Sequence, residues 1–319
     1  MRKNDSLLRQ LHLPTLWMGA GTVFAGSAAA VVRGNMDLFA ASLCVIFAAF
    51  AQLSSNFIGN YMTMKRDLLH EERPRFEGSK PRYNPLTVRL HREGAAACLL
   101  ICCMAGFGLL SMCRQWAWVL AVGGAVFLSI YLLNVGKHPL FKTPWVILFT
   151  FLLFGPLGVM TTSLLQSQRE AIGSIWDFFD MAPSLFLGPA TGLMALSVHF
   201  LYSYLNYRTD PRQNDRSMTK NSGPKAIEFL TAFDGFAMFG LMVWMVLALH
   251  ISQPLLAIVP AFIGCSFNLH IATRMRSAGI AELRHLVNMA IVNYLLFTLL
   301  TWVFCWIIAP PDDSAFQIF

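Results

Sequence analysis

The sequence predicts an all-α integral membrane protein, a polytopic bundle of nine transmembrane helices, from its composition, its hydropathy pattern and its charge distribution. Hydrophobic types make up 56% of the 319 residues and charged types 13%, about half the charged share of an average soluble domain. A backbone surrounded by lipid must satisfy its own hydrogen bonds, as an α-helix does. The composition therefore excludes a soluble enzyme or binding module.

Apolar stretches long enough to cross about 30 Å of hydrocarbon as helices follow one another along the chain. Polar or charged segments separate them, and we expect residues 1–319 to form a single domain. No A-x-A-like site follows the first stretch, so it predicts a span and not a cleavable signal peptide. In chain order the expected spans are 14–33, 38–62, 93–112, 115–135, 144–166, 182–205, 229–250, 254–273 and 286–308.

The basic residues predict a cytoplasmic N-terminus and a C-terminus on the opposite side. In that orientation, of the 24 Lys and Arg residues only Arg33, Arg114 and Arg169 lie outside the cytoplasmic segments. Such asymmetry follows the positive-inside rule. The net charge of +7 then reflects topology, and no nucleic-acid partner is expected.

A polar stripe closes the second span. Asn56, Asn60, Thr63 and Asp67 fall at about 0°, 40°, −20° and 20° of a helical wheel, on one narrow face. Polar groups gathered at the mouth of a membrane bundle indicate a site for a polar headgroup and not a lipid-facing surface.

Two long basic loops with embedded acids, 63–92 and 206–225, lie on the predicted cytoplasmic side. In the second, Asn206, Asp210 and Asn214 repeat the four-residue spacing of the stripe. Pro211 disfavours a helical conformation at Asp210, so we expect the helix to end or bend there.

Two such clusters fit a diphosphate bound with Mg²⁺. This ion takes one or two carboxylates and shares the rest of its shell with phosphate and water, while cations bind the phosphate charge. An apolar bundle beneath them would hold an isoprenoid tail. The candidate carboxylates are Asp67, Asp210 and Asp215, and the candidate cations are Lys65, Arg66, Lys137, Arg208 and Lys220.

Three stretches together resemble the UbiA-type polyprenyltransferase superfamily, and within it the bacterial members that prenylate 1,4-dihydroxy-2-naphthoate in menaquinone synthesis. They are QLSSNFIGNYMTMKRD at 52–67, GKHPL with LFTFLLFGPLGVMTTSLLQ in 136–166, and LNYRTDPRQNDRSMTKNS at 205–222; the opening LLRQLHLPTL is also similar. The resemblance implies a prenyl-group transferase of the bacterial inner membrane. Its implied partners are a polyprenyl diphosphate, an aromatic acceptor such as 1,4-dihydroxy-2-naphthoate, and membrane lipid, with Mg²⁺ as cofactor.

The motifs depart from the family pattern. The first usually reads N-D-x-x-D-x-x-x-D, and on residues 59–67 only Asp67 retains an acid, with Asn60 and Thr63 at inner positions and Asn56 upstream. In the second motif, Asp215, Lys220 and Ser222 fit one register, and Asp210 with Asn214 fits another. By resemblance, Asp67, Asp210, Asp215 and Asn60 are the metal ligands. The three acids are also the implied catalytic residues.

The implied reaction is departure of the diphosphate from the allylic carbon, attack by an electron-rich ring and restoration of aromaticity. For dihydroxynaphthoate the precedent implies loss of the carboxylate. Tyr61, Tyr131 and Phe154 are candidate cation–π walls, with ordinary packing as the alternative.

Other polar residues carry weaker signals. Asp234 lies in the seventh span, where an acid is either functional or an interfacial group that faces headgroups or pairs with Lys. His199 and His270 read as residues satisfied by helix neighbours, and the seven Cys as core. Asn268 and Arg274 could touch substrate.

Two rival classes remain. A secondary transporter would place polar clusters near the midplane, in paired broken segments, and the sequence has none. A catalytically altered family member would bind prenyl diphosphate or a quinone-like lipid without turnover.

Overall fold

The computed structural model describes residues 16–32, 36–71, 85–113, 116–135, 140, 143–166, 182–209, 218–251 and 253–308, with the backbone alone at 67–71 and 218–222. Within these ranges every regular element is a helix. The helices are α2 (Leu16–Val32), α3 (Leu38–Glu71), α4 (Pro85–Met112), α5 (Trp116–Asn134), α6 (Trp145–Phe154), α7 (Pro156–Gln166), α9 (Ala182–Thr209), α10 (Met218–Ala248), α11 (Pro254–Met275) and α12 (Ile280–Ile308).

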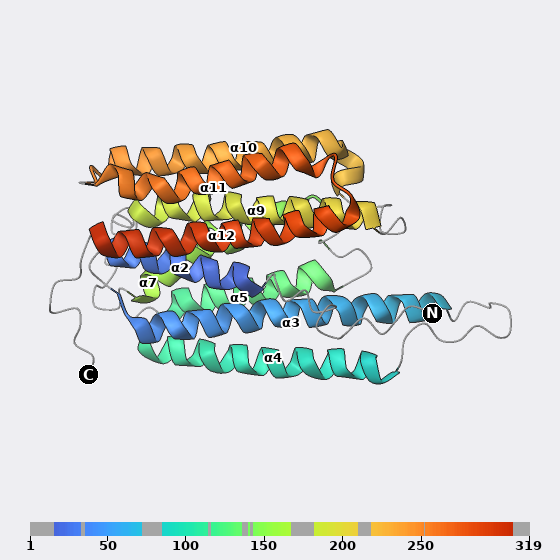
Figure 1. Cartoon of the computed structure of the whole chain (residues 1–319). Helices are drawn as coiled ribbons and strands as arrows, with labels where there is room; N and C mark the ends of the chain where they lie inside the picture. The colour runs from blue at the N-terminus through green and yellow to red at the C-terminus, as the bar shows by residue number, and fades with distance from the viewer. Residues whose placement is uncertain are drawn as a thin grey trace.

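The predicted fold class is confirmed in the part of the chain that is described. Each predicted span coincides with a helix, and α6 and α7 together form one of them. Eight spans have the length and composition needed to cross a membrane, and α2 is a shorter apolar helix. The helices lie side by side as one bundle (Figure 1).

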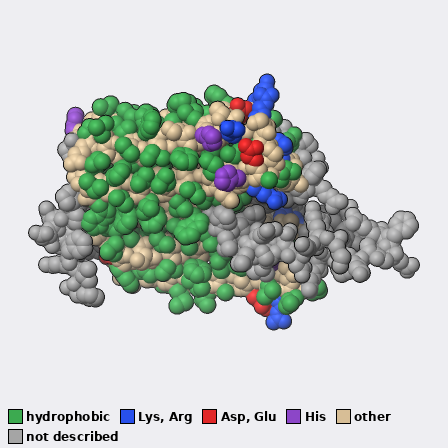
Figure 2. All heavy atoms as spheres, in the orientation of Figure 1, with side chains coloured by type: hydrophobic (Ala, Val, Ile, Leu, Met, Phe, Trp, Pro, Cys, Tyr) green, Lys and Arg blue, Asp and Glu red, His purple; other side chains and the backbone are tan. Residues whose placement is uncertain are grey.

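Charged side chains collect at one end of the bundle. Figure 2 shows an apolar surface over most of the visible face, with Lys, Arg, Asp and Glu mostly towards the end where α3, α9 and α11 finish. An apolar girdle with a charged end is the surface expected of a protein that spans lipid. Both predicted motif loops follow helices that finish at this end.

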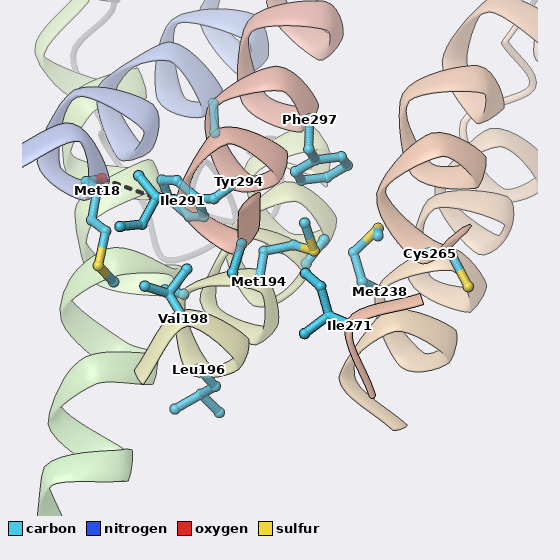
Figure 3. Packing of buried hydrophobic residues seen from close by; sticks show 14 of the residues in the cluster. Met18, Met194, Leu196, Val198, Met238, Cys265, Ile271, Ile291, Tyr294 and Phe297 are labelled. Carbon is cyan, nitrogen blue, oxygen red and sulfur yellow. Dashed lines mark hydrogen bonds between the residues drawn. The ribbon is translucent and has the colours of Figure 1, made fainter. Parts of the chain in front are cut away.

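The tightest packing lies around α9. In its most apolar stretch 72% of the residues are buried, against 17% in α5. Figure 3 shows buried Met194, Met238 and Phe297 in one apolar cluster of α9, α10 and α12, with Met18 of α2 beside it. The phenol of Tyr294 donates a hydrogen bond to the Met18 carbonyl oxygen at 2.9 Å. Helix α9 is thus central, whereas α5 is peripheral.

The span at 144–166 differs from the expected single helix because it is broken between α6 and α7. The break falls at Gly155, where φ is −114° and ψ is −112°, and Pro156 has no N–H to continue the helix. The Thr22 hydroxyl donates to the Phe154 carbonyl oxygen at 3.0 Å, the kind of side-chain bond that makes such breaks tolerable in lipid. A Cβ on Gly155 would lie 2.7 Å from the Gly188 carbonyl oxygen, so glycine permits close contact with α9.

Candidate functional site

A cavity of about 740 Å³ lies between α5 and the rest of the bundle. Its described lining comes from α2, α3, α4, α5, α6, α7 and α9, and not from α10, α11 or α12. The volume falls in the range of small-molecule sites, about 300–1,000 Å³. The cavity is therefore large enough for an organic ligand.

The cavity is apolar towards the ends of α4 and α7. Leu109 and Leu110 of α4, Val119 of α5 and Leu165 of α7 line it there. We call this part the apolar arm; its described lining holds no charged side chain, and the Thr161 and Thr162 hydroxyls of α7 are its polar groups. The arm suits a hydrocarbon chain.

At the opposite end, α3 presents a polar face to the cavity. Gln52, Ser55 and Asn56 all line it, and their spacing of three and four residues puts them on one side of the helix. The Gln52 amide nitrogen lies 3.4 Å from Asn56 Oδ1. Asn134 at the end of α5 donates to the Ser55 hydroxyl at 2.9 Å, so it ties the peripheral helix α5 to α3 beside the mouth of the cavity.

A second polar face belongs to α9. His199, Tyr202, Ser203 and Asn206 line the cavity at spacings of three, four and seven residues, again one side of a helix. The His199 ring packs at 6.3 Å, centroid to centroid, from that of Phe200. Of the residues predicted for the site, Asn56 and Asn206 thus reach one cavity from α3 and α9. We call these two faces and Asn134 the polar end.

Other predicted residues of the two motifs lie nearer the charged end and do not line the cavity. The Thr63 hydroxyl donates to the Gly59 carbonyl oxygen at 2.9 Å, and Arg66 Nε donates to the Met62 carbonyl oxygen at 3.1 Å. Lys65 is exposed, and Asn60 is half-buried on the same helix.

On α9, Arg208 is held by Tyr204. Its guanidinium donates to the Tyr204 hydroxyl at 3.1 Å and lies 5.8 Å from the centre of that ring. Helix α9 ends at Thr209, directly before Asp210, where Pro211 predicted its end. Arg208 is thereby placed between the cavity face of α9 and the second motif.

Six predicted residues lie outside the described side chains. The backbone at Asp67 is helical, as the stripe requires, because α3 continues to Glu71. The six are Asp67, Lys137, Asp210, Asn214, Asp215 and Lys220. Among the residues that are described, no group of three or more His, Cys, Asp or Glu is placed to hold a metal ion.

The three aromatic residues that are candidates for walls of the site lie in different environments. Phe154 lines the cavity beside the break between α6 and α7. Tyr131 of α5 is 59% exposed and does not line the cavity, and neither does Tyr61. Of the three, Phe154 is the one positioned to face a ligand.

A separate polar chain crosses the core on the far side of α9. Asn293 donates to Asn268 at 3.1 Å, Asn268 donates to Ser197 at 2.9 Å, and the Ser197 hydroxyl bonds to Asp234 Oδ2 at 3.3 Å. Asp234 is 3% exposed. The structure corrects the interfacial alternative for Asp234 because α10 begins at Met218 and carries this residue deep into the bundle. Asn268 belongs to this row of hydrogen-bonded side chains and does not line the cavity. Arg274 is exposed.

Sequence reasoning missed part of the polar end. His199 lines the cavity, contrary to the expectation that helix neighbours satisfy it, and Gln52, Tyr202, Ser203 and Asn134 also line it. Counting back from Asn206 by three, four and seven residues reaches Ser203, Tyr202 and His199. That period was the available signal.

The chain is similar to known proteins of one family. The sequence profile of the UbiA prenyltransferase family matches residues 20–293. No curated protein matches the chain significantly.

Solved structures add to the family match. The apo structure of a UbiA homologue from Aeropyrum pernix K1 is similar, with a TM-score of 0.61 and 14% sequence identity over 88% of this chain and 94% of that one. A structure of digeranylgeranylglyceryl phosphate synthase gives a TM-score of 0.46 at 10% identity, over 91% and 99% of the two chains. At 14% identity the likeness to the Aeropyrum pernix protein speaks for the fold alone. Because the family profile covers most of the chain, the protein belongs to the UbiA prenyltransferase family of helical membrane proteins, whose members are transferases of prenyl groups.

Proposed function

We propose that the chain, as a single domain, transfers a polyprenyl group from a polyprenyl diphosphate to 1,4-dihydroxy-2-naphthoate, with Mg²⁺ as cofactor. The observation that carries the proposal is the polarity of the cavity. Two polar helix faces line the cavity towards one end, and the apolar arm extends from them towards the other end. A prenyl diphosphate has the same division into a polar head and a hydrocarbon tail.

The polar end fits the head of the donor. Asn56 and Asn206 lie on helices that lead, within about one to three turns, to Asp67 and Asp210. Carboxylate and amide oxygens are the ligands that Mg²⁺ takes. We assign Asp67 and Asn60 of the first motif to hold the ion together with one acid of the second motif, Asp215 in one register or Asp210 in the other. When bound, the ion would offset charge on the departing diphosphate.

Cations near the same end would bind the diphosphate oxygens. Lys65, Arg66 and Arg208 lie on α3 and α9 beyond the cavity, and Lys220 lies in the first turn of α10. Lys137 follows α5 in the sequence and completes the proposed set. Arginine forms paired hydrogen bonds with phosphate, whereas lysine acts as a point charge. Asn214 and Thr63 add polar contacts in this assignment. Tyr131 is not assigned a role in binding the substrate or its cation because its side chain is exposed.

The walls of the cavity would protect the reacting carbon. When the allylic C–O bond breaks, its electron pair leaves with the diphosphate, and the ring of the acceptor bonds to the cation-like carbon. Water would quench that carbon, and the apolar lining excludes it. The Phe154 ring is positioned in the lining to stabilise positive charge through its face.

His199 would orient the aromatic acceptor. Its imidazole lies in the lining about two turns before Asn206, in the part of the polar end farther from the end of α9. A ring nitrogen there can accept a hydrogen bond from a hydroxyl of the acceptor. That bond would hold the ring beside the allylic carbon and increase its electron density.

The orientation proposed for the chain puts the polar end at the cytoplasmic face of a bacterial inner membrane. Both motif loops and most basic residues belong to that side of the predicted topology. Accessibility labelling of a cysteine introduced at Ser217, next to α10, against one introduced at Ser252, between α10 and α11, tests it in intact cells. With the partly exposed Cys113 replaced by serine in both variants, a membrane-impermeant reagent should label only the Ser252→Cys variant from outside.

A lipid extract assay tests the function. Purified protein, Mg²⁺, a polyprenyl diphosphate and 1,4-dihydroxy-2-naphthoate should give a prenylated, decarboxylated naphthoquinol by mass spectrometry. Product from a different aromatic acceptor alone would replace the proposed acceptor. Metal-dependent binding of the donor without product would identify a catalytically altered family member, the reading that the substitution of acids by Asn60 and Thr63 favours.

A further inference from the structure

Two consecutive glycines occupy the middle of α5, where they line the apolar arm. Gly123 and Gly124 both face the cavity, and a Cβ built on either would meet no atom within 4 Å. Most other described helical glycines differ: a Cβ on Gly21 would clash with the Tyr294 ring, and one on Gly192 would lie 2.8 Å from Phe151. Those glycines allow close packing, and the pair in α5 does not serve that purpose.

The pair is unfavourable for the helix itself. Glycine in a helix interior costs about 1 kcal/mol relative to alanine, and α5 gains no close helix contact in return. Gly123 is half-buried and Gly124 is exposed, so the missing side chains leave open space where the arm borders the outside of the bundle. A ligand that enters the arm at this level would use that space.

The distance from the polar end indicates which part of a ligand lies there. Residues of α5 line the cavity from Val119 to Asn134, a length of about 22 Å at 1.5 Å per residue. The pair lies ten to eleven residues before Asn134, about 15–17 Å along the helix. A geranyl group extends roughly 10 Å at ~1.2 Å per bond, so with its head at Asn134 it ends before the glycines, whereas a longer polyprenyl group passes them.

The arm is not closed at this level. Phe107 of α4 and Leu120 of α5 line the cavity and are also 70% and 51% exposed. A chain that passes Gly123 and Gly124 therefore has room to continue between α4 and α5 towards the surrounding lipid. The apolar character of both walls suits a hydrocarbon.

We infer that Gly123 and Gly124 keep the arm open for long polyprenyl groups and so determine the chain-length selectivity of the enzyme. The inference rests on the proposed function, because it assigns the arm to the tail of the prenyl donor. It predicts that side chains added at these two positions discriminate between donors by length.

The test compares kcat/KM for geranyl diphosphate and octaprenyl diphosphate in Gly123→Leu and Gly124→Leu. We expect the ratio of the octaprenyl to the geranyl value to fall at least tenfold in each variant. Gly240→Leu is the matched control, since Gly240 also has no atom within 4 Å of a built Cβ but lies on α10 away from the cavity. Its ratio should equal that of the wild type.

An unchanged ratio in both folded leucine variants would overturn the inference. An equal loss for both donors would also overturn it, because the pair would then affect the whole site and not the tail. If a leucine variant fails to fold, Gly123→Val and Gly124→Val test the same space with a smaller side chain.

Binding separates this inference from the proposed function. If the wild type turns over neither donor, prenyl transfer to this acceptor is refuted, and the Kd values of the two diphosphates still test the glycines. Weaker binding of octaprenyl diphosphate alone in the leucine variants would support the inference. Equal binding in the wild type and the variants would contradict it.

Discussion

Replacing Asp234 by asparagine should leave the protein at least as stable as the wild type. Asp234 is 3% exposed, and its described hydrogen bond is with Ser197, at 3.3 Å. No ion pair joins it to a described Lys, Arg or His. The amide oxygen of asparagine can accept the same hydrogen bond without a carboxylate in the core.

The expected magnitude follows from the site. An Asp at the centre of a membrane helix costs about 2.5–3.5 kcal/mol on insertion scales. Asparagine cannot ionise but keeps part of the polar cost, so we expect a change between zero and a gain of about 1–2 kcal/mol. Asp234→Leu removes the acceptor for Ser197, and one interhelical hydrogen bond in lipid is worth about 0.6 kcal/mol, at most ~1.7.

Unfolding in mixed micelles with increasing SDS, at neutral pH, measures both variants. We expect the asparagine variant to unfold at an SDS fraction equal to or higher than that of the wild type. A fall in the free energy of unfolding of Asp234→Asn by more than about 1 kcal/mol would refute this expectation, as would a folded variant that has lost turnover. Either result would mean that the carboxylate itself is required.

Further predictions concern the site and the core. Asp67→Ala and Asp215→Ala should each lower kcat by at least ~10²-fold with folding intact, while Cys102→Ala should keep wild-type turnover. Steady-state rates of the three variants measure this difference. Wild-type activity in both Asp variants would reject the metal assignment. His199→Phe should raise KM for the acceptor about tenfold, which corresponds to one hydrogen bond of about 1.4 kcal/mol, and should leave KM for the prenyl diphosphate unchanged. If a hydroxyl of the acceptor is the hydrogen-bond partner of His199, the variant and the wild type should have the same KM for an O-methylated acceptor. Tyr294→Phe loses the hydrogen bonds of the phenol with the Met18 carbonyl oxygen and with the Thr22 hydroxyl. It should lower the free energy of unfolding by about 1 kcal/mol without changing kcat, and an unchanged free energy would show that these bonds add nothing.

Hydropathy predicted the spans because each must cross lipid as a helix, whatever its neighbours are. It underestimated the lengths of α3 and α4, which continue past the apolar windows to Glu71 and back to Pro85. A helix holds its backbone bonds in water as well as in lipid, so charged residues end the apolar signal and not the helix. The break at Gly155 could be suspected from Gly-Pro, but whether it is tolerated depends on Thr22 of another helix.

The site was less predictable than the fold. The α3 stripe could be found because one helix places all its members, and the structure puts Asn56 in the cavity. Which other residues reach the cavity depends on how each helix is rotated about its axis, and tertiary packing decides that. For this reason His199 read as a packed residue and Tyr131 as either a wall or a packed residue, and the structure places His199 in the cavity lining and Tyr131 outside it, exposed.

The most direct measurement of the central claim is prenyl transfer by the purified protein with Mg²⁺, octaprenyl diphosphate and 1,4-dihydroxy-2-naphthoate, with and without chelator. We expect a prenylated, decarboxylated naphthoquinol that disappears with chelator and returns when Mg²⁺ is restored. Product that persists with chelator would contradict the metal assignment. No product from folded protein that binds the donor would contradict the proposed transfer.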